Sequence, residues 1–367
     1  MAVAITNPPS QDEIEAVTPD PVESAREAGL RYVHDSMPGI RRVATRNGSF
    51  RYIDAKGQEV TDPDERLRIK ALGIPPAWTD VWICANKRGH LQATGRDARG
   101  RKQYRYHEKY RQVRDEAKYE RMLAFAQFLP AIRQRVEEDL RKTGLPREKV
   151  LATLIKLLEG TLIRVGNDEY ARSNESYGLT TLRDEHARFR GEEVRFTFRG
   201  KSGKDHSISL HDRRLARIVK QCRDIPGERL FQYKGDDGEY HGVYSEDVNA
   251  YLREITGHDF SAKDFRTWAG TVLAAQALRE FEAFDSKAQA KKNVVRAIEA
   301  VAARLGNTKA ICRKCYVHPA VIDAYLDGAM LEGLRHRAED ELTNHLGELP
   351  PEEAAVLAFL RRRLSQN

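Results

Sequence analysis

The stretch VRFTFRGKSGKDHSISL, residues 194–210, alternates apolar and polar side chains on each side of a turn rich in glycine and lysine. A period of two is typical of β-strands, and RGKSGKD is typical of the turn between them. We therefore predict a β-hairpin here. Apolar residues on both sides of the hairpin recur with a helical period. A hairpin inserted among helices indicates a fold that combines helices with antiparallel strands.

Apolar side chains recur at helical spacing between Met122 and Leu140, and the pattern stops at Gly144, Leu145 and Pro146. Further helices are predicted at about 147–163, 211–223, 245–255, 263–280, 286–305 and 319–335. We place a mainly helical catalytic domain with an inserted hairpin at residues 113–345 and a short helical tail at 346–367.

The N-terminal part of the chain contains short β-type runs, SFRYID, DVWICAN and HLQATG, separated by turn signals. They predict a small antiparallel-sheet domain at residues 26–112, so that the whole chain has an α+β fold. Residues 1–25 hold five acidic residues, four prolines and no Lys or Arg, which predicts a disordered leader.

Composition excludes some classes of protein. No apolar run approaches the roughly 20 residues of a membrane-spanning helix, and the N-terminus lacks a signal-peptide pattern. Four cysteines, unevenly spread, argue against a secreted disulfide framework. We therefore expect a protein of the cytoplasm, associated with the nucleoid if it binds DNA, and no membrane partner.

Positive charge is concentrated in residues 85–114, which hold ten Lys or Arg and two acidic residues. The net charge of this window is +8. The net charge of the rest of the chain is −1, so the whole chain has a net charge of +7. Tyr104, Tyr106 and Tyr110 are interleaved with these charges. Such a pattern is typical of a surface for nucleic acid, although a solvated basic face would have the same composition.

The tripeptide Gly200 to Ser202 resembles the end of a phosphate-binding P-loop, but Arg195 stands where that loop needs its first glycine. We therefore expect no ATP dependence. Lys201 lies at the predicted hairpin tip, where an ammonium can reach a phosphate, although a single turn lysine is also consistent with simple solvation.

Cys312 and Cys315 form a CxxC pair directly before Tyr316. A structural zinc ion needs two more ligands at suitable spacing, and only His318 is near in sequence. A redox role would need a thioredoxin-like strand before the pair, which the sequence does not show. We interpret both cysteines as packed thiols and predict no metal site.

Two arginines stand in positions that need explanation. Arg266 follows Ser261 and Asp264, which are spaced like a capping box, so we expect it in the first turns of a helix. Arg164 follows an apolar run that we expect to be buried, where a charge needs a partner or a ligand. A guanidinium can hold two phosphate oxygens at once, although each arginine singly is also consistent with a structural salt bridge.

Four segments together resemble the type IB DNA topoisomerases, particularly the compact branch of poxviruses and bacteria, over residues of about 30 to 340. They are TLIRVGNDEY with YGLTTL, FRGKSGKDH, KDFRTW, and LGNT with CRKCY. By position, Arg164, Lys201, Arg266 and Tyr316 match the catalytic residues of the family. Asn307 stands where many members have histidine, and an amide can still donate to a phosphate oxygen.

The resemblance also extends to DNA contacts. RKQYRYH is similar to the groove-reading strand of the family, so Lys102, Gln103, Tyr104 and Tyr106 are expected to contact DNA. Tyr170, six residues after Arg164, matches another DNA-contacting position.

The resemblance implies an enzyme that relaxes supercoiled duplex DNA as a monomer, with no cofactor, metal or ATP. Tyr316 would attack a backbone phosphorus and form a 3′-phosphotyrosyl intermediate, and Lys201 would protonate the leaving 5′ oxygen. The N-terminal domain would close over the duplex as one half of a clamp.

Two alternatives stay open at this point. Tyrosine site-specific recombinases share the Arg, Lys, Arg and Tyr chemistry, but they usually have His-x-x-Arg, whereas Lys263 lies three residues before Arg266. Their N-terminal domain is helical rather than sheet-like. A non-catalytic DNA-binding or zinc-containing architectural protein would use the basic window alone, with Tyr316 merely packed.

Overall fold

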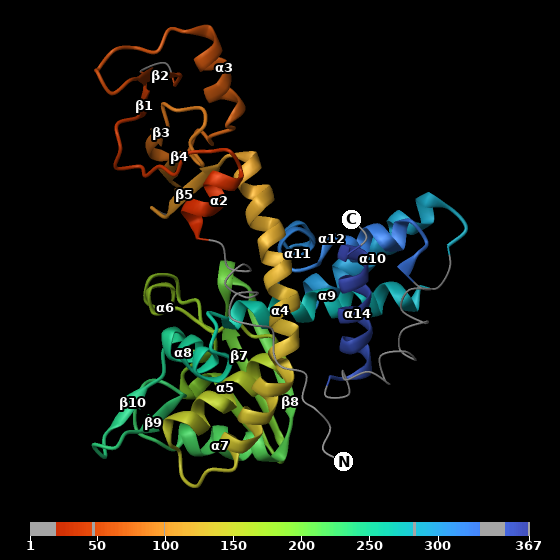
Figure 1. Ribbon diagram of the computed structural model, residues 1–367. Coiled ribbons are helices and arrows are strands. Elements are labelled where there is room, and N and C mark those ends of the chain that lie inside the picture. The colour runs from red at the N-terminus through yellow and green to blue at the C-terminus, as the bar shows by residue number, and fades with distance from the viewer. Residues whose placement is uncertain (1–19, 46–47, 99, 282–283, 331–348, 366–367) are drawn as a thin grey trace. The chain divides into compact units, whose positions relative to one another are not determined.

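The computed structural model describes residues 20–45, 48–98, 100–281, 284–330 and 349–365 (Figure 1). These residues form two compact units, which divide in the chain between Arg121 and Met122. Among the described helices, none combines the length and the hydropathy that a membrane span requires.

The N-terminal unit is built on a five-stranded antiparallel sheet in the order β2-β1-β3-β4-β5. The strands are β1 (Ile40–Ala44), β2 (Phe50–Ile53), β3 (Thr79–Ile83), β4 (Leu91–Arg96) and β5 (Lys102–Tyr106). One face buries apolar side chains, and these form the core with Ile69 of a short helix: Ile40, Val81, Ile83 and Ala93. The predicted antiparallel-sheet domain is confirmed.

Two helices of this unit were not predicted, α2 (Pro21–Glu27) and α3 (Pro63–Ala71). Each has an aspartate at its N-cap and a proline at its start, which is a standard helix-start signal. The expected disordered leader is wrong for residues 21–25, because Asp20 caps α2 and Ser24 and Ala25 are buried. The earlier residues of that expected leader lie outside the described part of the chain.

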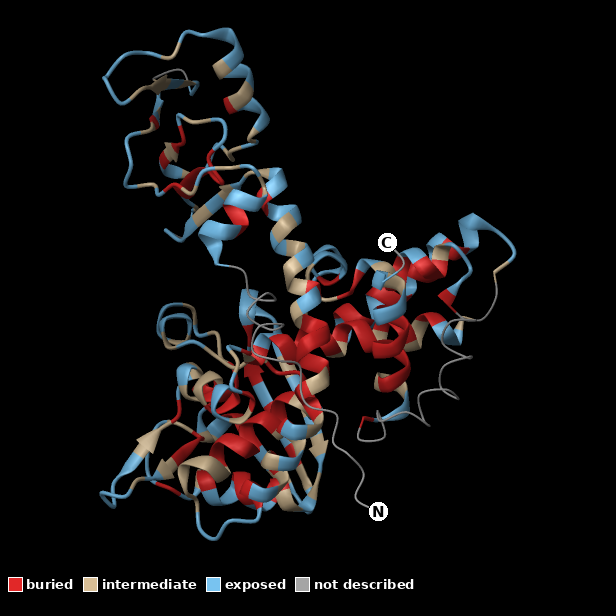
Figure 2. Cartoon of the chain, in the orientation of Figure 1, coloured by how far each residue is buried: buried red, intermediate tan, exposed pale blue. Residues whose placement is uncertain are grey.

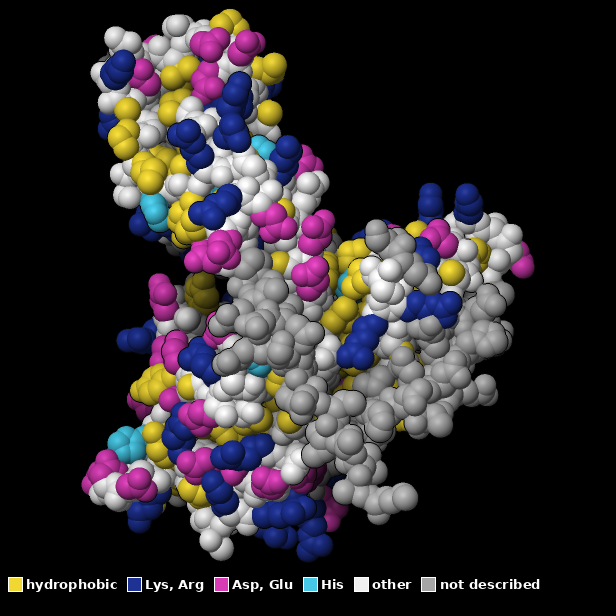
Figure 3. Space-filling view, in the orientation of Figure 1, with side chains coloured by type: hydrophobic (Ala, Val, Ile, Leu, Met, Phe, Trp, Pro, Cys, Tyr) yellow, Lys and Arg dark blue, Asp and Glu magenta, His cyan; other side chains and the backbone are white. Residues whose placement is uncertain are grey.

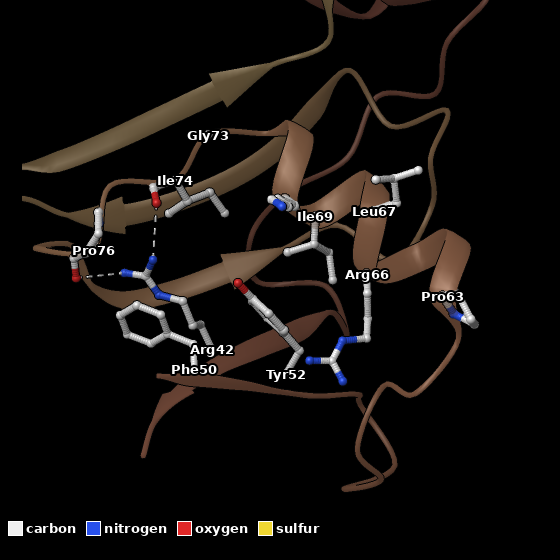
Figure 4. A pocket seen from close by; sticks show the side chains of 11 residues that line it. Arg42, Phe50, Tyr52, Pro63, Arg66, Leu67, Ile69, Gly73, Ile74 and Pro76 are labelled. Atoms are coloured by element: carbon white, nitrogen blue, oxygen red, sulfur yellow. Dashed lines mark hydrogen bonds between the residues drawn. The ribbon is translucent and has the colours of Figure 1, made fainter. Parts of the chain in front are cut away.

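A cavity of about 460 Å³ lies between α3 and the strands β1 and β2 (Figure 4). Arg42 forms part of its wall: the guanidinium lies over the Phe50 ring and donates hydrogen bonds to backbone carbonyls, including that of Trp78 at 2.6 Å. None of the predicted site residues lines this cavity.

The helix α4 (Glu108–Leu140) runs through residue 112, where the sequence predicted the domain boundary. The segment contains no glycine, and its one proline, Pro130, lies well inside the helix. The division between the compact units therefore falls within a helix rather than in a linker.

The second unit is mainly helical, as predicted, and α5 and α9 are largely buried within it (Figure 2). Its helices are α5 (Arg147–Thr161), α6 (Asp168–Asn174), α7 (Arg213–Arg223), α8 (Ser245–Thr256), α9 (Ala262–Glu280), α10 (Lys287–Leu305), α11 (Lys309–Cys315), α12 (Pro319–Leu326) and α14 (Pro351–Ser365). The helix expected at 319–335 ends early, because Gly328 adopts a left-handed φ of 77°.

The predicted hairpin is present as β7 (Glu193–Arg199) and β8 (Asp205–His211). A further strand, β6 (Ala187–Arg190), pairs with β7, so the hairpin belongs to a three-stranded antiparallel sheet. A second hairpin, β9 (Gln232–Lys234) and β10 (Tyr240–Gly242), was not predicted.

A buried carboxylate links α4 to α8. Asp139 is 1% exposed, accepts a hydrogen bond of 2.8 Å from the Tyr251 hydroxyl, and pairs with Arg135 and Lys142, each at 2.9 Å. Burial alone would raise the pKa of Asp139, but the hydrogen bonds from Lys142, Tyr251 and Arg135 outweigh it and lower that pKa.

Replacement of Asp139 with Asn should lower the free energy of unfolding at pH 7 by about 2 kcal/mol, because the buried carboxylate is lost and its charge-assisted hydrogen bonds to the partly exposed Arg135 and Lys142 are lost with it. Since the pKa of Asp139 is lowered in the fold, this contribution is present above about pH 4 and disappears as the pH falls through the folded pKa. Chemical denaturation across pH measures it, with the exposed neighbour Glu138→Gln as control. A constant difference down to pH 2 would contradict this account.

Candidate active site

Arg266 lies one turn inside α9, as the capping residues predicted. Asp264 accepts a hydrogen bond of 2.8 Å from the backbone N–H of Ser261, which fixes the start of the helix. The Arg266 side chain is 4% exposed and donates hydrogen bonds to the carbonyl oxygens of Leu162 and Leu305, the latter at 2.8 Å. Arg266 therefore joins the ends of α5 and α10 to α9.

Arg164 follows the end of α5, where Leu162 turns the chain with a left-handed φ of 57°. Its backbone carbonyl accepts a hydrogen bond of 2.8 Å from Leu179 N–H, and Val165 O accepts one of 2.6 Å from Thr180 N–H. These bonds pair the two halves of the segment TLIRVGNDEY…YGLTTL. They hold the half-buried Arg164 in place beside the end of α5.

Arg164 and Asn307 are in direct contact, because Arg164 Nη2 donates a hydrogen bond to Asn307 Oδ1. A guanidinium has no acceptor, so Asn307 must turn its oxygen toward Arg164 and keep its Nδ2 amide for another partner. Within the described residues, Asn307 Nδ2 and Arg266 Nε are buried and have no acceptor. Two buried donors thus remain available to a ligand.

The two guanidinium groups carry uncompensated charge. No carboxylate of the described chain lies within ion-pair distance of Arg164 or Arg266, which argues against the structural salt bridges considered above. Burial and the nearby Arg164 charge together lower the pKa of Arg266 to about 10, while Tyr316 opposes the shift. Burial also lowers the pKa of Arg164. Both remain cationic at neutral pH.

Tyr316 lies directly after α11, and its ring centroid is 5.4 Å from Arg266 Cζ. The backbone at Tyr316 is packed closely against α9. A Cβ atom at Gly270 would lie 2.5 Å from Tyr316 O, and the Thr271 hydroxyl accepts a hydrogen bond of 3.1 Å from His318 N–H. The helix that carries Arg266 therefore also positions the backbone of the tyrosine.

Lys201 begins the turn of the β7–β8 hairpin and is exposed. A small cavity brings this turn together with both arginines, since Lys201, Arg164 and Arg266 all contribute to its lining. The same turn contacts Asn307 through Lys204, whose Nζ donates a hydrogen bond of 3.3 Å to Asn307 O. The structure thus gathers all five predicted catalytic residues in one cluster, since Asn307 contacts Arg164 and the Tyr316 ring lies beside Arg266.

Cys312 is buried and Cys315 is half-buried, and both are free thiols. Burial raises the pKa of Cys312 to about 11, which disfavours the reactive thiolate. In the part of the chain that the structure describes, no group of three or more His, Cys, Asp or Glu residues could hold a metal ion.

The predicted DNA-contacting residues of β5 lie on opposite faces of an edge strand. Tyr104 and Tyr106 are 47% and 39% exposed on one face, and their rings stack with centroids 6.0 Å apart. Lys102 shares that face and pairs with Asp35 at 2.6 Å. Gln103 points the other way and donates a hydrogen bond of 2.9 Å to Asp97, as strand alternation requires.

Basic and apolar side chains lie next to each other on the visible surface of the N-terminal unit (Figure 3). In the other unit, Tyr170 lies on α6 and is 46% exposed. It does not line the cavity that holds the two arginines.

Sequence reasoning did not single out three features of this site. They are Gly270, the carbonyl groups of Leu162 and Leu305, and His206 of β8, which lines the cavity with Lys201. A glycine inside a helical pattern was a signal for Gly270, since such a residue often marks a close backbone approach. The carbonyl partners and His206 have no local signal.

Comparisons with known proteins agree with this arrangement. The family described as "Eukaryotic DNA topoisomerase I, catalytic core" matches residues 107–339. The family described as "Bacterial DNA topoisomerase IB, N-terminal domain" matches residues 49–97.

Individual proteins similar to this chain are also named as DNA topoisomerases. DNA topoisomerase 1B of Acanthamoeba polyphaga mimivirus is 31% identical over 296 residues, which cover 79% of this chain and 88% of the relative. DNA topoisomerase 1B of Vaccinia virus (strain Copenhagen) is 22% identical over 283 residues, 74% of this chain and 86% of the relative. The catalytic-core match spans more than half of the chain, and together these similarities exclude the recombinase and architectural alternatives. The chain therefore belongs to the type IB DNA topoisomerases, the enzymes that relax supercoiled DNA.

Proposed function

We propose that Arg164, Arg266, Asn307 and Tyr316 bind one backbone phosphate of duplex DNA. The observation that supports this most is that the buried Arg266 and the half-buried Arg164 lack a carboxylate partner, while Arg266 Nε and Asn307 Nδ2 are buried donors without acceptors. Buried charges and buried donors are destabilising unless a partner satisfies them. A phosphodiester supplies both the negative charge and the oxygen acceptors.

In the proposed reaction, the Tyr316 hydroxyl attacks the phosphorus. A bond forms between Tyr316 Oη and phosphorus, the bond from phosphorus to the 5′ oxygen breaks, and the phenolic proton passes to solvent. Because a phenol is a weak nucleophile at neutral pH, Arg164 and Arg266 must stabilise the charge that gathers on the non-bridging oxygens. The product is a 3′-phosphotyrosyl enzyme, and the reverse reaction reseals the strand without ATP.

Lys201 is the proposed general acid. Its ammonium gives a proton to the leaving 5′ oxygen, and its place in the hairpin turn beside the arginines supports that role. The cationic side chains stabilise the charge that a magnesium ion stabilises in other phosphoryl transfers, so we propose that the reaction needs no metal.

The N-terminal domain, residues 26–112, is proposed to bind the duplex with the exposed face of β5. Tyr104 and Tyr106 present stacked aromatic rings there, beside Lys102. Gln103 would have to leave Asp97 to contact DNA. Tyr170 is a proposed contact on the catalytic domain, residues 113–345. We propose that the enzyme acts as a monomer on the duplex DNA of the nucleoid.

Tyr316→Phe should abolish plasmid relaxation, with a loss of about 10⁴-fold or more, because the nucleophile is removed. The measurement is relaxation of supercoiled plasmid in excess chelator, followed by denaturant trapping and identification of the residue that carries DNA. Tyr240→Phe, an exposed tyrosine on β10, is the matched control. Covalent DNA on any residue other than Tyr316 would refute the assignment.

Gly270→Ala should slow strand cleavage by about 100-fold, because the new Cβ would lie 2.5 Å from Tyr316 O and displace the tyrosine. Formation of the covalent complex in a single turnover measures the loss. Gly160→Ala in α5 is the control, since its Cβ would meet only the Leu210 side chain, at 3.3 Å. A Gly270→Ala enzyme that cleaves at the wild-type rate would show that this contact does not position Tyr316.

Tyr104→Ala and Tyr106→Ala should each weaken duplex binding about fivefold, or about 1 kcal/mol, through lost aromatic contact. Since no charge is removed, the slope of log K against log salt should stay the same. Fluorescence anisotropy with a labelled duplex at several salt concentrations tests this, with Tyr240→Ala as control. Unchanged affinity in both variants would exclude this face of β5 from the DNA interface.

A further inference from the structure

His206 occupies a position between the two turns that carry Lys201 and Asn307. It lies on β8 opposite Phe198 of β7, and the two rings stack with centroids 5.1 Å apart and planes 18° apart. The side chain is half-buried and lines the same cavity as Lys201, Arg164 and Arg266.

Two glycines make room for this imidazole. Gly200 directly precedes Lys201, and a Cβ atom there would lie 2.5 Å from His206 Cδ2. Gly306 directly precedes Asn307, and a Cβ atom there would lie 2.6 Å from His206 Cε1. The two ring carbons on either side of Nε2 therefore face the backbone of the two turns, so the ring sets the distance between the turns.

Burial lowers the pKa of His206, and the positive charges of Arg164, Arg266 and Lys204 lower it further, whereas Asp205 opposes the shift. The ring is therefore neutral at pH 7. A neutral imidazole adds no repulsion to the cationic cluster, and its one N–H is too weak an acid to protonate the leaving oxygen. These properties suit a residue that places other groups rather than one that reacts.

We propose that His206 is a positioning residue, which holds the Lys201 turn against the Gly306–Asn307 turn so that both residues reach the same phosphate. This inference rests on the proposed roles of Lys201 and Asn307. Without the ring, the hydrogen bond from Lys204 to Asn307 O, at 3.3 Å, is the one that still joins the two turns among the described residues. Lys201 would then lose its alignment with the leaving 5′ oxygen.

The test compares two duplex substrates in single-turnover cleavage, one with the normal 5′ oxygen and one with a bridging 5′ sulfur at the scissile phosphate. A thiol is more acidic than an alcohol, so sulfur departs without a proton from Lys201. We expect His206→Ala to slow cleavage of the oxygen substrate by about 30-fold, since misplacement by about 1 Å can cost that order of rate. Cleavage of the sulfur substrate should fall less than threefold.

Further variants test whether the loss of rate is specific to the role of His206 in positioning Lys201. His206→Gln, a planar neutral side chain, should restore most of the rate. If His206→Ala unfolds, His206→Thr replaces it, since threonine suits a strand but is too short to contact both turns. His211→Ala, on the exposed face of the same strand, should cleave both substrates normally. Arg266→Ala should lose activity on both substrates.

Equal losses on both substrates for His206→Ala or its Thr replacement, or no loss at all, would overturn the positioning role. Lys201→Ala provides the separate test of the proposed general acid. If Lys201→Ala slows cleavage of both substrates equally, the general-acid assignment is wrong, and the inference about His206, which rests on it, is wrong as well. If Lys201→Ala is rescued by sulfur and His206→Ala is not, only the inference about His206 is wrong.

Discussion

The guanidinium of Arg266, bonded to the carbonyl groups of Leu162 and Leu305, is the interaction on which the rest of the site depends. Both carbonyls lie at the C-terminal ends of helices, α5 and α10, where backbone acceptors lack a partner inside the helix. The helix dipoles also place partial negative charge there, which favours a cation. Arg266 can therefore be buried without a carboxylate, and its positive charge is only partly compensated.

The same interaction brings the proposed phosphate-binding groups together. Arg164 stands two residues after Leu162, Asn307 stands two residues after Leu305, and the two side chains are hydrogen-bonded to each other. One arginine on α9 thus fixes the ends of two other helices, and the residues that follow those ends meet. A carboxylate at this place would neutralise the cluster and remove its attraction for an anion, so the use of carbonyl groups is compatible with the proposed binding of phosphate.

Close backbone approaches position the reactive groups around this cluster. Gly270, one helical turn beyond Arg266, lets the backbone of Tyr316 approach α9, and Gly200 and Gly306 admit the ring of His206. Contacts of this kind are stiffer than contacts between long side chains, because backbone atoms cannot change rotamer. The long Lys201 side chain is flexible and is the exception. The backbone of the turn that carries it is packed against the ring of His206.

The sequence by itself determined the family, the α+β class, the hairpin at 194–210 and most of the helices, because hydrophobic periodicity and catalytic motifs are local properties of the chain. It also named Arg164, Lys201, Arg266, Asn307 and Tyr316 as candidates. It did not reveal α2 and α3, whose start signals stand in short segments, or the early end of α12. Only the tertiary structure decided that Arg266 bonds carbonyl groups rather than a carboxylate, that Asn307 keeps its amide donor free, and that His206 lies between two turns. These facts depend on contacts between segments far apart in the chain, 39 residues for Arg266 and Leu305 and 104 for Leu162 and Arg266, and no local pattern encodes which distant backbone atoms will meet.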